Sequence, residues 1–209
     1  MSIRPMTVDG VVAELADTIG GRAHDEWLRV ALDGAPPTRP GALADGLVDP
    51  LRLRGRPVLR VRAADFLRPA SLRFERGRTD PDSRYEDWLD TGALTREVLA
   101  PLEPGGTGRV LPSLWNAETD RASRAEYVPL PAGGVLLLDG ELLLGRGFAL
   151  EYSVHLWMSR PALTRRLADQ WAVPAFERYH EQVRPLRVAM TGVRVDDPAH
   201  PAVFDDSPV

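Results

Sequence analysis

Residues 28–42 read LRVALDGAPPTRPGA, and this stretch decides the fold. The apolar run that opens it ends in Asp33 and Gly34. A short apolar run that stops at an acid and a glycine is typical of a strand buried on both faces of a sheet and followed by a tight loop. Beyond the proline-rich loop, leucines at helical spacing predict a helix over 41–53, interrupted near Pro50.

Strands and helices continue to alternate along the rest of the chain. The further predicted strands cover residues 57–66, 134–140, 153–158 and 187–195, and the further predicted helices cover 11–19, 92–102 and 161–171. Such alternation indicates an α/β protein with a mostly parallel sheet and right-handed crossovers. In sheets of this kind ligands bind at the carboxyl ends of the strands.

The length of the chain, 209 residues, favours a single domain, because domains average roughly 150 residues. We expect the core to span about residues 26–198. Three segments are expected to lie outside it. They are 68–90 as an extended, solvated segment, 109–130 as a hairpin or small insert lobe, and 196–209 as a solvated terminus.

Charge and composition exclude several kinds of partner. The formal net charge is −4 and the pI is about 5.6, so there is no overall attraction to nucleic acid or to an anionic membrane. No stretch approaches the ~20 apolar residues of a membrane span. The chain has no cysteine, which excludes thiolate zinc sites and fits a reducing cytoplasm. We expect a cytoplasmic protein with a small-molecule partner, and the sequence leaves a homo-oligomer open.

All 26 basic residues are arginines. Codon bias in a GC-rich genome is the simplest origin of this composition. Its chemical consequence is that no lysine can act as a phosphate ligand, a Schiff-base former or a general base. Any side-chain cation that contacts a phosphate in this protein must therefore be an arginine.

Three predicted strand ends carry carboxylates, namely Asp33, Asp65 and Asp139. Parallel strands bring their carboxyl ends to one edge of a sheet, so these acids are expected to converge. Each alone could be an ordinary strand terminator. His155 lies on an apolar strand and is expected to be a core residue with satisfied hydrogen bonds.

The order of the motifs resembles the uridine kinase family, in particular its shorter bacterial members. The resemblance covers roughly residues 28–198, and its strength lies in the order, because each motif alone is weak. The similar stretches are VALDGA at 30–35, ADF at 64–66 followed by Arg68-Pro69, RGR at 76–78 with Asp80-Pro81, YEDWLD at 85–90, LAPL at 99–102, VLLLDG at 135–140 and Arg178-Tyr179.

The resemblance implies a P-loop NTPase-like three-layer sandwich with helices on both faces of the sheet and a small lid or insert. In the family this fold transfers the γ-phosphate of ATP to a nucleoside hydroxyl. By this likeness Asp65 is the catalytic base, and Asp139 lies near the nucleoside and near magnesium, if magnesium binds. The implied substrate contacts are Phe66, Arg68, Arg78, Tyr85, Asp87 and Tyr179, and the implied phosphate-binding lid carries Arg165, Arg166 and Arg178.

The phosphate loop departs from the family pattern. A working loop needs glycines whose amides surround phosphate, then a lysine and a Ser/Thr hydroxyl. When the loop is aligned on Gly34, Pro40 stands at the lysine position and Gly41 at the hydroxyl position, while Pro37 and Arg39 replace glycines. The phosphate-binding candidates that remain are Gly34, Thr38, Arg39 and Gly41.

Three functional hypotheses follow from this departure. The first is a uridine kinase-like protein that keeps a nucleoside- or sugar-type pocket and uses Mg-ATP only if the altered loop still functions. The second is a catalytically inactive pseudokinase that serves as a binding or regulatory module. The third is a repurposed enzyme that uses Asp65 or Asp139 as acid or base without ATP. Binding of Mg-ATP separates the first hypothesis from the other two.

Overall fold

The computed structural model describes residues 2–23 and 25–205. Its centre is a seven-stranded sheet in the order β1-β11-β10-β9-β2-β8-β3. The strands are β1 Ile3–Pro5, β2 Leu28–Gly34, β3 Val58–Arg62, β8 Val135–Gly140, β9 Tyr152–Trp157, β10 Thr191–Arg194 and β11 Ala202–Phe204. The five strands from β10 to β3 are parallel, and β11 and β1 extend one edge antiparallel. The predicted mostly parallel sheet is confirmed.

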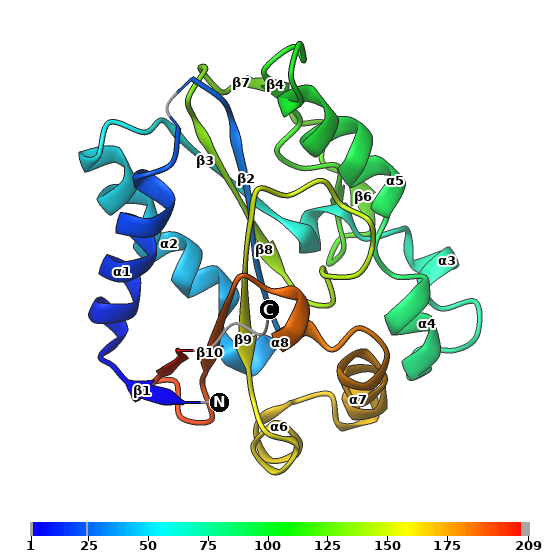
Figure 1. Ribbon diagram of the computed structural model, residues 1–209. Coiled ribbons are helices and arrows are strands. Elements are labelled where there is room, and N and C mark those ends of the chain that lie inside the picture. Colours follow the sequence, from blue (N-terminus) through cyan, green and yellow to red (C-terminus); the bar gives the residue numbers. More distant parts are fainter. Residues whose placement is uncertain (1, 24, 206–209) are drawn as a thin grey trace.

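Helices cover both faces of this sheet, which gives three layers (Figure 1). Helices α1 (Val8–Gly20) and α2 (Pro40–Leu53) pack on one face and enclose one apolar core. Helices α5 (Thr91–Leu94) and α7 (Val173–Gln182) lie on the other face and contribute to the second core. Successive residues of the central strands point alternately into these two cores, as expected for parallel strands that are buried on both faces.

Helix α2 runs through Pro50 to Leu53, so the predicted interruption at Pro50 is wrong. Proline lacks the N–H that would bond the carbonyl of residue 46, but this removes a single hydrogen bond close to the helix end. Leu47 and Leu51 lie on either side of Pro50 and are fully buried against the sheet. Their packing holds the last turn in helical geometry.

The helix predicted over 92–102 is present but changes its geometry along its length. Residues Thr91–Leu94 are α-helical, Thr95–Leu99 form a π-helical turn, and Ala100–Leu102 form a 3₁₀ turn. Asp90 begins the helix by accepting a hydrogen bond from the amide of Ala93 at 2.8 Å. Pro101 lacks an N–H, which is consistent with the change of geometry at this end.

The segment 68–90 is not the extended, solvated chain that its charges suggested. It contains α3 (Ala70–Arg73) and α4 (Pro81–Glu86), and both Arg73 and Arg84 are buried. The Arg73 guanidinium lies 4.8 Å from the ring centroid of Phe74, and the Arg84 guanidinium lies 5.1 Å from that of Trp88. Stacking on aromatic rings lets an arginine enter a core without an apolar sequence pattern.

The C-terminal part of the chain also differs from the prediction. Helix α6 (Arg160–Arg166) is shorter than the predicted 161–171, and α8 (Pro185–Val188) precedes the short strand β10. The segment after Asp196 returns to the sheet as β11, whose residues Ala202 and Val203 are buried, so the described part of this tail is not a solvated terminus. A three-residue strand is too short to show alternation in the sequence.

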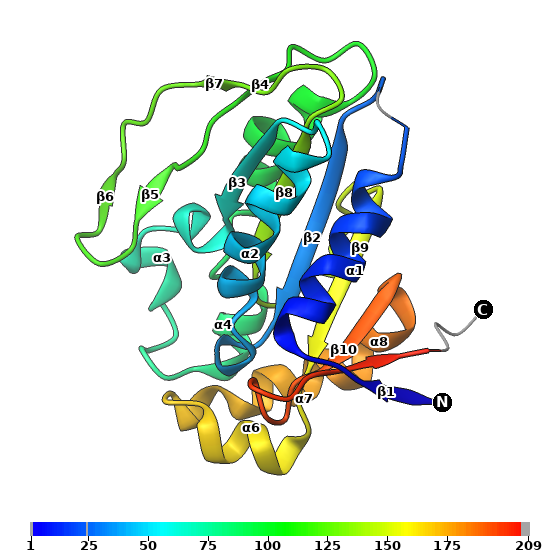
Figure 2. The same ribbon diagram turned by 90° about the vertical axis from the view of Figure 1, so that its left-hand side faces the viewer.

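Residues 109–130 form two short antiparallel pairs outside the seven-stranded sheet. Strand β4 (Arg109–Val110) pairs with β7 (Val128–Pro129), and β5 (Trp115–Asn116) pairs with β6 (Arg121–Ala122). Figure 2 shows this segment running along one side of the molecule, away from α1. Within the described residues, no helix combines the length and the apolar character that crossing a membrane requires.

Candidate functional site

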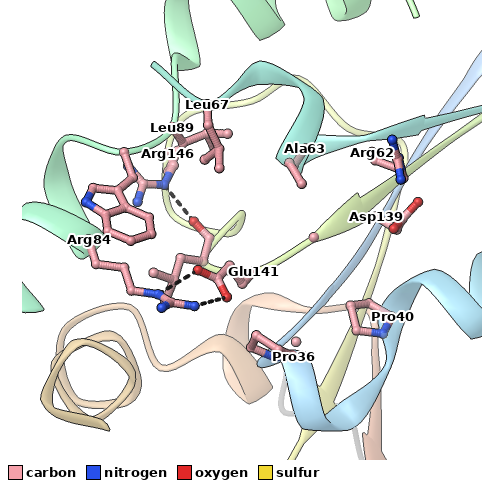
Figure 3. A pocket seen from close by; sticks show the side chains of 15 residues that line it. Pro36, Pro40, Arg62, Ala63, Leu67, Arg84, Leu89, Asp139, Glu141 and Arg146 are labelled. Atoms are coloured by element: carbon pink, nitrogen blue, oxygen red, sulfur yellow. Dashed lines mark hydrogen bonds and ion pairs between the residues drawn. The ribbon is translucent and has the colours of Figure 1, made fainter. Parts of the chain in front are cut away.

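A cavity of about 300 Å³ opens at the carboxyl ends of β2, β3 and β8 (Figure 3). This is the edge at which a mostly parallel sheet is expected to bind ligands. Its lining residues are Gly34, Pro36, Pro40, Arg62, Ala63, Ala64, Leu67, Arg84, Trp88, Leu89, Asp139, Gly140, Glu141, Leu142 and Arg146. We call it the central cavity.

The loop that borders the central cavity uses its own backbone donors. Residues Pro36–Thr38 form a 3₁₀ turn in which the amide of Thr38 donates to the Ala35 carbonyl at 2.8 Å, and the amide of Arg39 donates to the Pro36 carbonyl at 3.0 Å. The Thr38 hydroxyl is buried and donates to the Ala35 carbonyl at 2.7 Å. These donors are therefore turned away from any phosphate in the cavity.

Gly34 and Arg39 frame this closed turn. A Cβ atom at Gly34 would lie 2.3 Å from the Thr38 hydroxyl oxygen, so only glycine fits above the turn. Arg39 has a left-handed backbone with φ of 58°, and it lines a second groove beside α1, not the central cavity. Of the four phosphate-binding candidates in the loop, only Gly34 lines the central cavity.

Asp139 lines the central cavity and is paired with an arginine. Its Oδ1 accepts from Nε of Arg60 at 2.7 Å, and its Oδ2 accepts from a terminal nitrogen of the same guanidinium at 3.1 Å. A second terminal nitrogen of Arg60 donates to Asp45 on α2. Because Asp139 is held by this bidentate pair, its carboxylate is positioned but not free.

Asp65 lies beside the cavity on a 3₁₀ turn, Ala63–Phe66, and not at the end of a strand as predicted. Its two carboxylate oxygens accept from Arg62 at 2.7 and 2.9 Å, and Arg62 lines the cavity. Asp65 therefore positions a cavity arginine. The Asp65 side chain is not itself part of the lining, so its influence on the cavity is limited to holding Arg62 in place.

Arg84 forms one wall of the cavity inside an aromatic cluster. Its guanidinium lies 5.1, 5.4 and 5.7 Å from the ring centroids of Trp88, Trp171 and Phe176. It also donates to Glu141 at 2.9 and 3.0 Å and to Asp169 at 3.1 Å. Although burial lowers the pKa of Arg84, these carboxylates raise it on balance, so the charge is fully compensated.

Arg146 also lines the cavity, and its charge is not compensated in this way. Its guanidinium donates to the backbone carbonyls of Leu142, at 2.6 Å, and Tyr85. Within residues 2–23 and 25–205, no carboxylate lies within ion-pair distance of it. Burial lowers the pKa of this side chain on balance, although more distant groups, the Asp33 and Glu141 carboxylates among them, oppose this shift. Figure 3 shows Arg146 and Arg84 across the cavity from Arg62 and Asp139.

Asp33 is fully buried and organises the protein beneath the cavity edge. Its carboxylate accepts from the amide of Leu143 at 2.9 Å, from the Tyr179 hydroxyl at 2.9 Å, and bonds Nδ1 of His155 at 2.6 Å. Burial, and then the nearby Asp33 charge, raise the pKa of Tyr179, which keeps its hydroxyl protonated as a donor. His155 is buried in the core as expected, but the expectation that its hydrogen bonds are satisfied is wrong, because its Nε2 has no partner among the described residues.

The other predicted site residues do not line the central cavity. Phe66 and Tyr179 are buried in the core, whereas Tyr85 lines, with Tyr179, a neighbouring pocket that shares Leu142 and Arg146 with the central cavity. The remaining predicted site residues lie at or near the surface. Arg68 is half-buried, and Arg165 and Arg166 are exposed on α6. The others contact neighbouring side chains: Arg78 stacks on Phe74, Asp87 pairs with Arg76, and Arg178 pairs with Asp82 and Glu86.

Sequence reasoning missed the arginines that shape the cavity, Arg60, Arg62, Arg84 and Arg146. A signal for two of them was available in the sequence, because Arg60 and Arg62 alternate on a predicted strand and so share one face of it. The structure places Arg62 in register with Asp139 on the neighbouring strand. The other two were hidden, since Arg84 belongs to a segment with little periodicity and Arg146 to a loop between β8 and β9. Their position depends on tertiary packing alone.

His180 on α7 supplies a pH-dependent contribution to stability. Burial, and then the neighbouring His155, lower its pKa from 6.5 to about 4. The folded protein therefore disfavours the charged form, so stability is complete above pH 6.5 and falls as the pH drops toward 4. After allowance for partial exposure, we expect a loss of about 2–3 kcal/mol over this range.

The measurement is urea unfolding of wild type and His180→Gln at a series of pH values. The variant should be less pH-dependent by about 2–3 kcal/mol between neutral and acidic conditions. Parallel pH profiles for the two proteins would show that His180 does not carry this effect.

No model of a known protein family matches the chain, and no curated protein matches it. Solved structures do match it. A possible uridine kinase from Bacillus stearothermophilus superposes with a TM-score of 0.72 at 19% identity, covering 87% of this chain and 96% of that chain. A candidate fructose transport system kinase from Silicibacter sp. TM1040 gives a TM-score of 0.60 at 22% identity, covering 85% and 90%.

These likenesses show the fold. The chain has the α/β fold of the P-loop kinases, as its motif order predicted.

The residues of the loop do not fit Mg-ATP, the cofactor that this fold implies. Phosphate binding needs amides that point outward, a lysine and a hydroxyl on the metal. Here Pro36, Pro37 and Pro40 have no amide donor, and Thr38 bonds within its own turn. No group of three or more metal-ligating side chains gathers anywhere in the described ranges.

Proposed function

We propose that this protein binds a nucleoside- or sugar-type small molecule that carries an anionic group, in the central cavity, without transferring phosphate from ATP. The observation that carries the proposal is the guanidinium of Arg146, which lines the cavity and has no carboxylate partner among the described residues. A half-buried charge without a directly paired carboxylate is unfavourable, and an anionic ligand would supply that partner.

The rest of the lining supports a ring-bearing ligand with polar edges. Trp88 offers an aromatic face, and Leu67, Leu89 and Leu142 offer apolar surface. The carboxylates of Asp139 and Glu141 are paired with Arg60 and Arg84, and the second lone pair of each oxygen is what they offer to sugar hydroxyls. Pockets for small ligands combine an apolar lining with a few convergent polar groups in this way.

The absence of phosphate transfer follows from the loop. Each charge-assisted phosphate contact is worth about 1.5–3 kcal/mol, and a lysine, a hydroxyl and several amides are missing together. The proposal therefore joins the ligand pocket of the first hypothesis to the inactivity of the second. By the resemblance, Asp65 would be the base of a kinase reaction; here we propose that it positions Arg62.

A thermal-shift screen tests the binding proposal. The ligands are uridine, cytidine, their 5′-monophosphates, ribose 5-phosphate and Mg-ATP. At saturation a phosphorylated nucleoside or sugar should raise the Tm by about 5 °C or more, because a ligand at about 100 times its Kd stabilises by about 2.7 kcal/mol. Mg-ATP should give no shift, and radiolabelled γ-phosphate should not appear on any acceptor.

A matched pair of variants locates the binding. Ala64 lines the cavity and is exposed, so Ala64→Trp should fold and obstruct the cavity. Ala122 is also exposed, on β6, and is not part of the lining. The ligand-induced shift should disappear in Ala64→Trp and persist in Ala122→Trp. If no ligand in the screen shifts the Tm, or if Mg-ATP does, the proposal is wrong.

A further inference from the structure

Arg60 projects from β3 to the point where the phosphate loop meets the strand-end acid. It bonds two elements, through Asp139 on β8 and Asp45 on α2, and its guanidinium lies beside Gly41 at the start of α2. A Cβ atom at Gly41 would lie 2.7 Å from a terminal nitrogen of Arg60 and 3.1 Å from Oδ2 of Asp139. The guanidinium therefore lies directly against the second residue of α2.

In P-loop enzymes a Ser/Thr at this loop position and a strand-end Asp hold Mg²⁺ between them. Gly41 stands at the hydroxyl position of the loop, and Asp139 is the strand-end acid. A magnesium ion between them would need space beside Gly41 and an unpaired Asp139 carboxylate. Arg60 occupies that space and bonds both oxygens of Asp139.

We infer that the guanidinium of Arg60 replaces the divalent cation of the P-loop kinase fold, so that this site is built to work without metal. One positive charge on Arg60 faces the carboxylates of Asp139 and Asp45, as a cation bound there would. The glycine at position 41 and the arginine at position 60 depend on each other, because any larger side chain at 41 would displace the guanidinium.

This inference deepens the proposed function and rests on it only for the ligand. It implies that the central cavity binds its anionic ligand directly through protein guanidinium groups, without a bridging metal. The ligand class is thereby restricted to anions that do not depend on chelated magnesium, such as monophosphate esters or carboxylates. Nucleoside triphosphates, which bind as magnesium complexes, are excluded.

The test uses Mn²⁺ alone as the probe, so its outcome does not depend on whether a nucleoside or sugar binds. Mn²⁺ binding is measured by electron paramagnetic resonance on wild type, Arg60→Ala and Arg60→Gln. Both substitutions remove the positive charge of Arg60. Because a unit charge within ~4 Å of a bound cation repels it strongly, Mn²⁺ binding should strengthen by more than tenfold. Glutamine keeps a hydrogen-bond donor near Asp139, which guards against loss of folding in the alanine variant.

Two controls assign the gained affinity. Arg60→Ala/Asp139→Asn should lose it, because the strand-end ligand is gone. Arg54→Ala removes another arginine that is paired with a carboxylate, Asp17, on the surface, and should leave Mn²⁺ binding as in wild type. If wild type already binds Mn²⁺ as tightly as Arg60→Ala, or if neither Arg60 variant gains affinity, Arg60 does not stand in a metal position and the inference fails.

Discussion

Replacing Asp33 by alanine should destabilise the protein by about 3–5 kcal/mol, the largest effect expected of any single acid in this chain. The carboxylate is fully buried, and it bonds the amide of Leu143, the hydroxyl of Tyr179 and a ring nitrogen of His155. Alanine would leave these groups in the core without their acceptor. Urea unfolding monitored by circular dichroism measures the loss.

Asp65→Ala is the matched control, because Asp65 was predicted alongside Asp33 as a strand-end acid. Its ion pair with Arg62 lies at the surface, where such pairs contribute about 0–1 kcal/mol. Tyr179→Phe removes one of the donors to Asp33 and should cost about 1–2 kcal/mol. Equal losses for Asp33→Ala and Asp65→Ala would contradict a structural role for Asp33.

The contrast between these acids shows how far sequence reasoning reaches. Buried strands with Asp-Gly ends were predictable at 28–34 and 134–140, because a short, continuous apolar run that stops at turn residues is typical of a strand covered on both faces. Which acid faces the cavity was not predictable. All three acids end predicted strands, and Asp33 and Asp139 share the same apolar run and Asp-Gly ending, yet the structure places Asp33 in the core, Asp65 beside the cavity and Asp139 in its lining.

The altered phosphate loop was more predictable than most of the site. Three prolines remove three amide donors whatever the fold does, so the loss of the usual phosphate cradle follows from the residues alone. What could not be foreseen is that Arg60 would fill the space beside Gly41. That contact joins residues from separate elements, and no spacing in the sequence encodes it.

The prediction for segment 68–90 failed for a different physical reason. Periodicity detects burial of apolar side chains, whereas α4 is anchored by Arg84, a charged residue stacked among aromatic rings and paired with two acids. In a protein without lysine, arginine supplies every long cationic side chain that packs in this way. A pattern that counts every arginine as solvated therefore underestimates the core of this chain.

Replacing Arg146 by glutamine should weaken binding of uridine 5′-monophosphate, or of whichever phosphorylated ligand the screen identifies, by about 10- to 100-fold. One charge-assisted contact is worth about 1.5–3 kcal/mol, and Arg146 is the cavity arginine whose hydrogen bonds go only to backbone carbonyls among the described residues. The unphosphorylated nucleoside should lose little. Isothermal titration calorimetry on both ligands separates the anion contact from general damage to the pocket.

Arg62→Gln is the matched control for this prediction. Arg62 also lines the cavity, but two of its three guanidinium nitrogens bond the carboxylate of Asp65, so its charge is already compensated. We expect a loss of only a few-fold for the monophosphate, because a compensated arginine adds little net field at the ligand. If the two variants weaken the monophosphate equally, or if Arg146→Gln weakens uridine as much as its monophosphate, then Arg146 does not bind the anion. In that case the missing counterion near Arg146 would be a feature of the fold and not of a ligand.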